Sequence, residues 1–214
     1  MRERIAAACA RVGRDPSEVE LVAVTKGRDP AEVRALVAAG QRVLGENRVQ
    51  AWREAADAVG DLDVAWHLIG HLQRNKVRFC RRIASIHSLD SERLALALED
   101  EGAKHAHRFE VLVQVNVSGE ASKYGVAVGE LAALLEAVAP LTHVRVRGLM
   151  TMAPYADDPE EARPHFRRLR ALAEQHGLRE LSMGMSGDFE VAVEEGATIV
   201  RVGSALFETP TPSL

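Results

Sequence analysis

A lysine follows the first strongly apolar run of this sequence. Lys26 comes directly after the run Leu21-Val22-Ala23-Val24-Thr25. Burial beside apolar side chains favours the neutral form of an amine, and a neutral primary amine attacks aldehydes to form a Schiff base. The alternative is a lysine that begins a loop and points to solvent. Lys26 alone does not decide between the two.

Two pairs of glycine and serine near the C-terminal end could bind a phosphate group. Ser186-Gly187 and Gly203-Ser204 each follow a predicted strand and open a short helix. Exposed backbone N–H groups at such a position attract anions, and the hydroxyls add donors. Ordinary turn and helix-capping chemistry is the alternative interpretation. Taken together with Lys26, these pairs predict a site for an aldehyde that bears a phosphate, such as pyridoxal 5′-phosphate (PLP).

Other patterns that could do chemistry are incomplete. His67 and His71 have the spacing of a zinc-binding helix, but Leu68 stands where that motif requires Glu, so we expect no metal site. The stretch around Ser186 nearly spells a nucleophile elbow, but Asp188 replaces its final glycine. The sequence contains neither G-x-G-x-x-G nor a Walker loop. Hydrolase and nucleotide-binding chemistry are therefore not indicated.

Eight short apolar runs alternate with longer amphipathic segments along the whole chain. Near-continuous apolar runs are typical of parallel strands that are covered on both faces. The predicted strands are 21–25, 42–45, 64–69, 84–88, 110–116, 144–150, 180–185 and 198–202. The predicted helices are 1–11, 31–39, 47–59, 72–82, 91–104, 126–138, 159–176 and 187–195, with at most a short one after Val202.

This alternation predicts a closed (β/α)8 barrel with an extra N-terminal helix. An open doubly wound sheet is the alternative, but it usually has fewer strands and a clear switch point. Sites in barrels lie where the strands end. The polar groups expected to meet there are Lys26, Glu46, Asn47, His67, Ser88, Gln114, Asn116, Thr151, Ser186, Arg201, Gly203 and Ser204.

Length and composition limit the remaining possibilities. The chain has 214 residues, is 47% hydrophobic and carries a formal net charge of −4. We expect one domain over residues 1–208 and a flexible tail over 209–214. The charge balance argues against a nucleic-acid partner, and no apolar run is long enough to cross a membrane. Cys9 and Cys80 indicate no disulfide framework and are expected in helices as small core residues, so a cytoplasmic location is the default.

Ordered blocks of sequence resemble one family over nearly the whole length. They are LVAVTK at 21–26, GENRVQ at 45–50, WHLIGHLQRNK at 66–76, IHSLD at 86–90, SKYG at 122–125, RGLMTM at 147–152, LSMGMS at 181–186 and VRVGSALF at 200–207. The chain thereby resembles the PLP-binding homeostasis proteins of the YggS/PROSC type. The resemblance implies a single barrel similar to the PLP domain of alanine racemase.

The resemblance also implies roles for particular residues. Lys26 would bind PLP as a Schiff base, Arg201 would face the pyridine nitrogen and Asn47 would lie near the ring. The phosphate would be held by Ser186, Gly203 and Ser204. Small departures from the family pattern are Thr25 before the lysine, Gly187, and Glu208 after the last phenylalanine.

The resemblance implies a role in intracellular PLP homeostasis, with the cofactor buffered or delivered to PLP-requiring apo-enzymes. A cation at the pyridine nitrogen weakens the ring as an electron sink, which favours a carrier over an enzyme. The alternative is an amino-acid racemase or lyase that uses Lys26 as a base. Tyr124 and Tyr155 are the only tyrosines available as a second acid or base.

Overall fold

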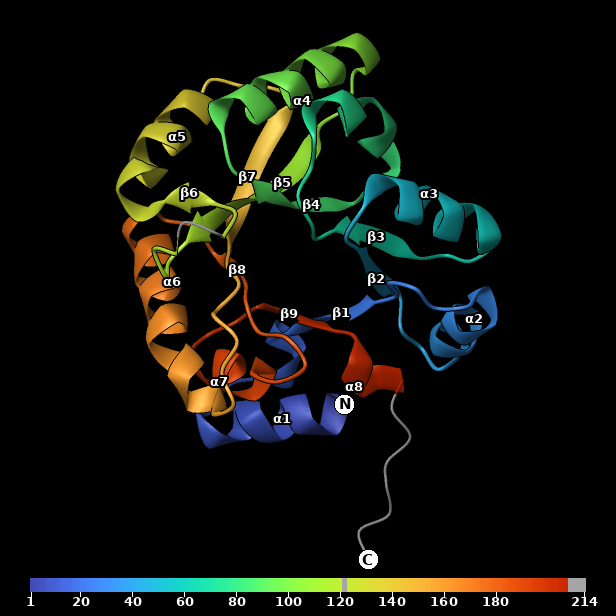
Figure 1. The fold of residues 1–214 in the computed structure, drawn as a ribbon, viewed down its shortest axis with the longest axis vertical. Coiled ribbons are helices and arrows are strands. Elements are labelled where there is room, and N and C mark those ends of the chain that lie inside the picture. The colour runs from blue at the N-terminus through green and yellow to red at the C-terminus, as the bar shows by residue number, and fades with distance from the viewer. Residues whose placement is uncertain (121–122, 208–214) are drawn as a thin grey trace, which may run out of the picture.

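Eight parallel strands close into a barrel in the computed structural model, which describes residues 1–120 and 123–207 (Figure 1). The order around the barrel is β1, β2, β3, β4, β5, β7, β8 and β9, with β9 paired again to β1. Their bounds are Glu20–Val24, Val43–Glu46, Ala65–Leu68, Ser85–Leu89, Phe109–Asn116, Val144–Met150, Glu180–Ser182 and Ile199–Val202. The predicted barrel is confirmed, and every barrel strand lies within a few residues of its predicted position.

Helices surround the barrel on all sides in Figure 1. They are α1 Arg2–Arg11, α2 Pro30–Ala38, α3 Val49–Ala58, α4 Glu92–His105, α5 Leu131–Val138, α6 Arg163–Gln175, α7 Phe189–Glu194 and α8 Ser204–Phe207. The start of α2 is fixed by a capping box. Asp29 accepts a hydrogen bond from the N–H of Ala31, and Glu32 accepts one from the N–H of Asp29. This cap holds the far end of the loop that begins at Lys26.

Four predicted elements differ from the structure. The segment 72–82 forms a 3-10 helix, η2, over Arg74–Arg82 instead of an α-helix. Its buried residues Val77 and Cys80, followed by Ile83, recur every three residues, which matches the 3-10 repeat. The predicted helix 126–138 begins as a short strand, β6 Val126–Ala127, paired with β5, followed by the 3-10 helix η3 Val128–Glu130.

The third difference is at β8, which ends at Ser182 instead of residue 185. Gly184 has φ +93°, a left-handed conformation that turns the chain out of the sheet. The predicted helix 159–176 starts with a 3-10 turn, η4 Pro159–Ala162, before α6. The predicted tail 209–214 lies outside the described residues.

Two sets of apolar side chains make up the core. The larger set packs between the strands and the surrounding helices and includes Cys9 and Cys80, which are both buried as predicted. The smaller set fills the barrel interior and consists of Val22, Ile69, Leu112, Met150 and Ile199. Because side chains alternate along a strand, positions two or four residues from these also face inward. This parity places Val24, the last residue of β1, on the inward side.

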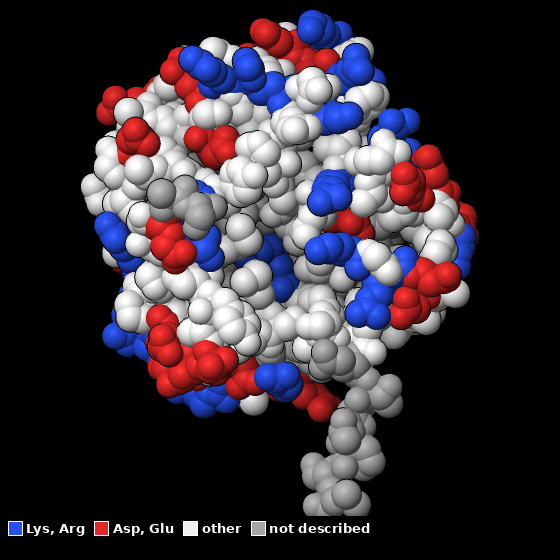
Figure 2. Space-filling model, in the orientation of Figure 1, with Lys and Arg blue, Asp and Glu red and all other residues white. Residues whose placement is uncertain are grey.

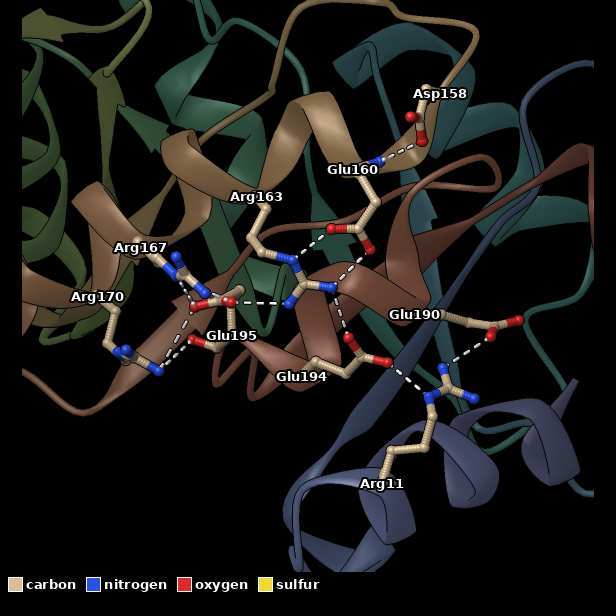
Figure 3. A network of polar contacts seen from close by, with 9 residues as sticks. All are labelled: Arg11, Asp158, Glu160, Arg163, Arg167, Arg170, Glu190, Glu194 and Glu195. Atoms are coloured by element: carbon tan, nitrogen blue, oxygen red, sulfur yellow. Dashed lines mark hydrogen bonds and ion pairs between the residues drawn. The ribbon is translucent and has the colours of Figure 1, made fainter.

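An ion-pair network on the outside ties α1 to α6 and α7 (Figure 3). The guanidinium of Arg163 contacts Glu194 at 2.7 Å and Glu195 at 2.8 Å. Arg11 in turn contacts Glu194 and Glu190, the latter at 2.9 Å. The carboxylates of α7 are therefore shared between two helices that are far apart in sequence.

Among the described residues, no helix is long and apolar enough to cross a membrane.

Candidate functional site

Lys26 stands at the rim of the barrel, in the turn after β1. The turn is closed by a hydrogen bond from the N–H of Arg28 to the carbonyl of Thr25, at 3.0 Å. The side chain of Lys26 is exposed. Of the two alternatives, the structure shows the lysine in a loop at the barrel rim, because β1 ends at Val24 and the turn carries Lys26 beyond the apolar interior. The amine remains accessible to a small molecule that enters from solvent.

A buried carboxylate lies behind Lys26. Glu46, the last residue of β2, is 2% exposed and accepts a hydrogen bond from the hydroxyl of Thr25 at 2.6 Å. Burial raises the pKa of Glu46, while the Thr25 hydroxyl and the positive charge of Lys26 oppose that shift. The contact joins the ends of β1 and β2. The block Gly45-Glu46-Asn47 indicated a strand end, but nothing in its spacing assigned Glu46 a role.

Asn47 follows Glu46 and is half-buried at the same rim. Its backbone is touched directly by the segment after β3. A Cβ atom added at Gly70 would lie 2.2 Å from the carbonyl oxygen of Asn47, so only glycine permits this approach. The position of Asn47 thus depends on a residue that is 23 positions away in the sequence.

The two predicted phosphate-binding pairs lie together, because β8 and β9 are neighbours. The hydroxyl oxygen of Ser186 accepts a hydrogen bond from the N–H of Gly203 at 3.3 Å. Ser204 is exposed and begins α8, whose first N–H groups have no acceptor within the helix. Gly203 lies beside the end of β1, because a Cβ atom added to it would have Val24 as its nearest neighbour, at 3.4 Å. The donors are hydroxyls and amides, which suit a phosphate group.

Arg201 lies one step deeper, on β9, and is 3% exposed. One terminal nitrogen donates to the carbonyl oxygen of Thr151 at 2.9 Å, and the other donates to the hydroxyl of Ser182. Burial lowers the pKa of Arg201 to about 10, and the negative charge of Asp188 opposes the shift. The guanidinium is therefore still positively charged at neutral pH. Figure 2 shows a hollow at the centre of this face with Lys or Arg side chains around it and at its bottom.

The predicted end of its strand placed His67 at the mouth, and the structure shows that it is not there. It lies inside the barrel, 7% exposed, and its Nδ1 is 3.0 Å from Nε2 of His87. Burial lowers the pKa of His67 to about 4. His71 does reach the mouth, where it stacks on Tyr124 and its Nδ1 lies 3.3 Å from Asp90. The two histidines are thus in different layers, because β3 ends between them.

Metal-ligand clusters are absent from the described residues, and one of the two tyrosines lies far out in solvent. Within the described ranges, no group of three or more His, Cys, Asp or Glu side chains could hold a metal ion. Tyr155 is 92% exposed and lines an apolar hollow of about 230 Å³ together with Met152 and Met185. This hollow adjoins the loop that contains Ser186.

Sequence reasoning missed the groups that surround Arg201. Thr151 was expected at a strand end, but its carbonyl contact was not, and His87, Ser182 and Asp188 received no role. The signal that could have found them is the alternation of the strands. His87 and Ser182 both stand at inward positions of apolar strands, where a polar side chain requires a partner.

Comparisons with known proteins agree with this architecture. The family described as "Alanine racemase, N-terminal domain" matches residues 1–210. A "Pyridoxal phosphate homeostasis protein" of Aquifex aeolicus is 45% identical over 212 residues, which is 96% of this chain and 93% of that protein. One of the same name from Pseudomonas aeruginosa is 43% identical, covering 95% of this chain and 90% of that protein.

Solved structures give the same picture. PipY of Synechococcus elongatus with PLP bound is 38% identical, with a TM-score of 0.83 and coverage of 97% of this chain and 99% of PipY. Alanine racemase from Corynebacterium glutamicum is 19% identical, with a TM-score of 0.69, and this chain covers 62% of it. The racemase likeness concerns the fold alone.

Proposed function

This chain belongs to the pyridoxal phosphate homeostasis proteins and to the alanine racemase N-terminal domain family, and from that premise we propose that it binds PLP and serves in intracellular PLP homeostasis. Residues 1–208 would form the single PLP-binding domain. The cofactor would be buffered, or delivered to PLP-requiring apo-enzymes, in the cytoplasm. PipY, a relative matched over nearly its whole length, has been solved with PLP bound, which supports the choice of cofactor.

One observation supports the proposal above all others. Three neighbouring strands, β8, β9 and β1, end in the groups that an aldehyde with a phosphate needs. β1 is followed by the accessible amine of Lys26, and β8 and β9 are followed by the hydroxyls and amides of Ser186, Gly203 and Ser204. Adjacent strands are about 4.8 Å apart, so the ends of β8 and β1, with β9 between them, are about 10 Å apart across the sheet. Asn47 completes the rim on the other side of β1.

PLP supplies an aldehyde that condenses with a primary amine, together with a phosphate dianion that needs several donors. In this site Lys26 would provide the amine, and its exposure leaves it accessible both to arriving PLP and to water or a competing amine. Such exposure suits a protein that takes up and releases its cofactor. An enzyme that keeps PLP through many turnovers gains from excluding water.

Arg201 gives a second reason to favour a carrier. Its guanidinium only donates hydrogen bonds, and it stays charged at neutral pH despite its burial. Placed at the pyridine nitrogen, a fixed cation disfavours protonation of the ring, and catalysis at the amino-acid α-carbon needs a strong electron sink. The proposed role of Arg201 is therefore to hold the ring in an unreactive state.

The test is the visible absorption of the purified protein. An absorption band in the visible range is expected for the parent protein and should be lost in Lys26→Ala. The control Lys104→Ala should keep the band, because Lys104 is an exposed lysine on α4 away from the mouth. Circular dichroism would show that both variants are folded. Borohydride reduction followed by peptide mapping should label Lys26. A label on another lysine would refute the assignment.

The racemase or lyase alternative is tested by turnover. Protein loaded with PLP is incubated with L-amino acids in deuterated water, and exchange of the α-proton is followed by NMR. A carrier should exchange protons slowly or not at all. Rapid exchange that is lost in Lys26→Ala would establish the enzyme alternative instead.

A further inference from the structure

Four polar side chains form a continuous hydrogen-bonded chain across the barrel interior. His67 on β3 contacts His87 on β4, with Nδ1 and Nε2 3.0 Å apart. His87 Nδ1 lies 2.9 Å from the hydroxyl oxygen of Ser182 on β8, which also accepts from Arg201 on β9. Their exposed fractions are 7% for His67, 3% for Arg201 and 0% for the other two. This row of side chains thus joins opposite sides of the barrel through its buried interior.

The direction of every hydrogen bond in this chain follows from its arginine end. A guanidinium can only donate, so Ser182 Oγ must accept from Arg201. In the described part of the protein, His87 Nδ1 is the one acceptor within reach of the Ser182 hydroxyl proton. His87 Nδ1 must then be unprotonated, and the proton of the neutral ring sits on Nε2. Burial lowers the pKa of His87 well below its usual range, as does the charge of Arg201, which keeps the ring neutral.

The tautomer of His67 follows from that of His87. Because His87 Nε2 donates, Nδ1 of His67 accepts, and the proton of His67 is also on Nε2. That last N–H belongs to the ring that lines a cavity of about 420 Å³ at the opposite end of the barrel, with Glu20, Ser85, Glu110, Arg147 and Glu180 around it. The chain therefore has one polarity, from the guanidinium beneath the mouth to the cavity below.

We propose that His87 and His67 are positioning residues, which fix the proton of Ser182 so that its lone pair is held toward Arg201 and the guanidinium is presented to the mouth. The contact between Arg201 and the PLP ring rests on the proposed function. The fixed tautomers of the two histidines do not depend on it. Without His87 the Ser182 hydroxyl loses its acceptor. A hydroxyl that rotates away then no longer holds the guanidinium, whose remaining bond is to the carbonyl of Thr151.

The first experiment needs no cofactor. In ligand-free protein labelled with ¹⁵N, long-range ¹H–¹⁵N spectra report the tautomer of each neutral histidine. His87 and His67 are both expected with the proton on Nε2. In Ser182→Ala the constraint is removed, and resonances of the second tautomer should appear. A proton on Nδ1 of either ring in the parent protein, or unchanged spectra in the variant, would overturn the proposal.

The second experiment measures the consequence for PLP. Ser182→Ala should release PLP about tenfold faster, which is the order of one hydrogen bond to a charged group, and should shift the visible band. Cys9→Ala is the matched control, because Cys9 is also 0% exposed, loses a single heavy atom and lies on α1, outside the barrel. Release as slow as in the control would overturn the positioning role.

Variants of His87 separate positioning from packing. His87→Asn places an amide oxygen near the position of Nδ1 and should keep the band and the slow release, whereas His87→Phe should lose both. If His87→Phe does not fold, Ser182→Ala still decides, since it removes one oxygen. If the parent protein binds no PLP, the proposed function fails. The tautomer spectra still test the hydrogen-bonded row from Arg201 to His67, because they need no cofactor.

Discussion

The buried histidine pair should make this protein lose stability in mildly acidic solution. His67 has an ordinary pKa of 6.5, and burial lowers it to about 4 in the folded protein. Between these values the unfolded chain binds a proton at this position and the folded chain does not. Unfolding therefore takes up a proton, and the free energy of unfolding falls as the pH falls through this window.

The size of the effect follows from the two pKa values. Between pH 7.5 and 5.5, His67 alone should lower the free energy of unfolding by about 1.3 kcal/mol, and the limit at still lower pH is about 3.4 kcal/mol. His87 acts in the same direction, because its pKa is also lowered. In His67→Asn only the contribution of His87 remains. The difference in unfolding free energy between parent and variant should thus change by about 1.3 kcal/mol over these two pH units.

Urea unfolding of both proteins at pH 7.5, 6.5 and 5.5 measures this difference, since ΔG in water is obtained by linear extrapolation. The comparison cancels the many carboxylates that both proteins share. His105→Asn is the control, because His105 is exposed on α4 and lacks the burial that distinguishes His67. Parallel profiles of ΔG against pH for the parent and His67→Asn would refute the reasoning, since His67 would then bind its proton equally in both states.

Five further outcomes are expected. Ser204→Asp should abolish PLP retention in equilibrium dialysis by setting a carboxylate against the phosphate dianion, and pyridoxal, which lacks the phosphate, should bind the parent far more weakly than PLP. Gly70→Ala should weaken PLP binding in the same assay with little change in the barrel, because the new methyl group displaces the backbone of Asn47. Arg201→Glu, once its visible spectrum shows that PLP is bound, should exchange amino-acid α-protons in deuterated water faster than the parent; slower exchange would contradict the restraining role. Arg163→Ala should lower the free energy of unfolding by about 1–2 kcal/mol in urea titration, since it removes the ion pairs that join α6 to α7.

The sequence by itself determined the barrel, because its signals are local. Largely apolar runs such as 110–116 are typical of parallel strands covered on both faces, and their regular alternation with helices leaves few other folds. The same logic placed Lys26, Ser186, Gly203 and Ser204 at one rim, since the carboxyl ends of parallel strands meet there. Errors came where local signals were weak. Val126 reads equally well as the start of a helix or as a strand, and only its pairing with Val115 decides.

Tertiary structure alone decided which polar groups touch. His67 and Ser182 are 115 positions apart in the sequence, and nothing in their spacing indicates that His87 lies between them. The contact between His87 and Ser182 exists because β4 and β8 face each other across a closed barrel, where neighbours are determined by which side chains point inward and by their height along the barrel axis. Exposure likewise depends on where β1 ends, so Lys26 stands in solvent although it follows five largely apolar residues. Distances across a barrel depend on closure and register, and those are properties of all eight strands together.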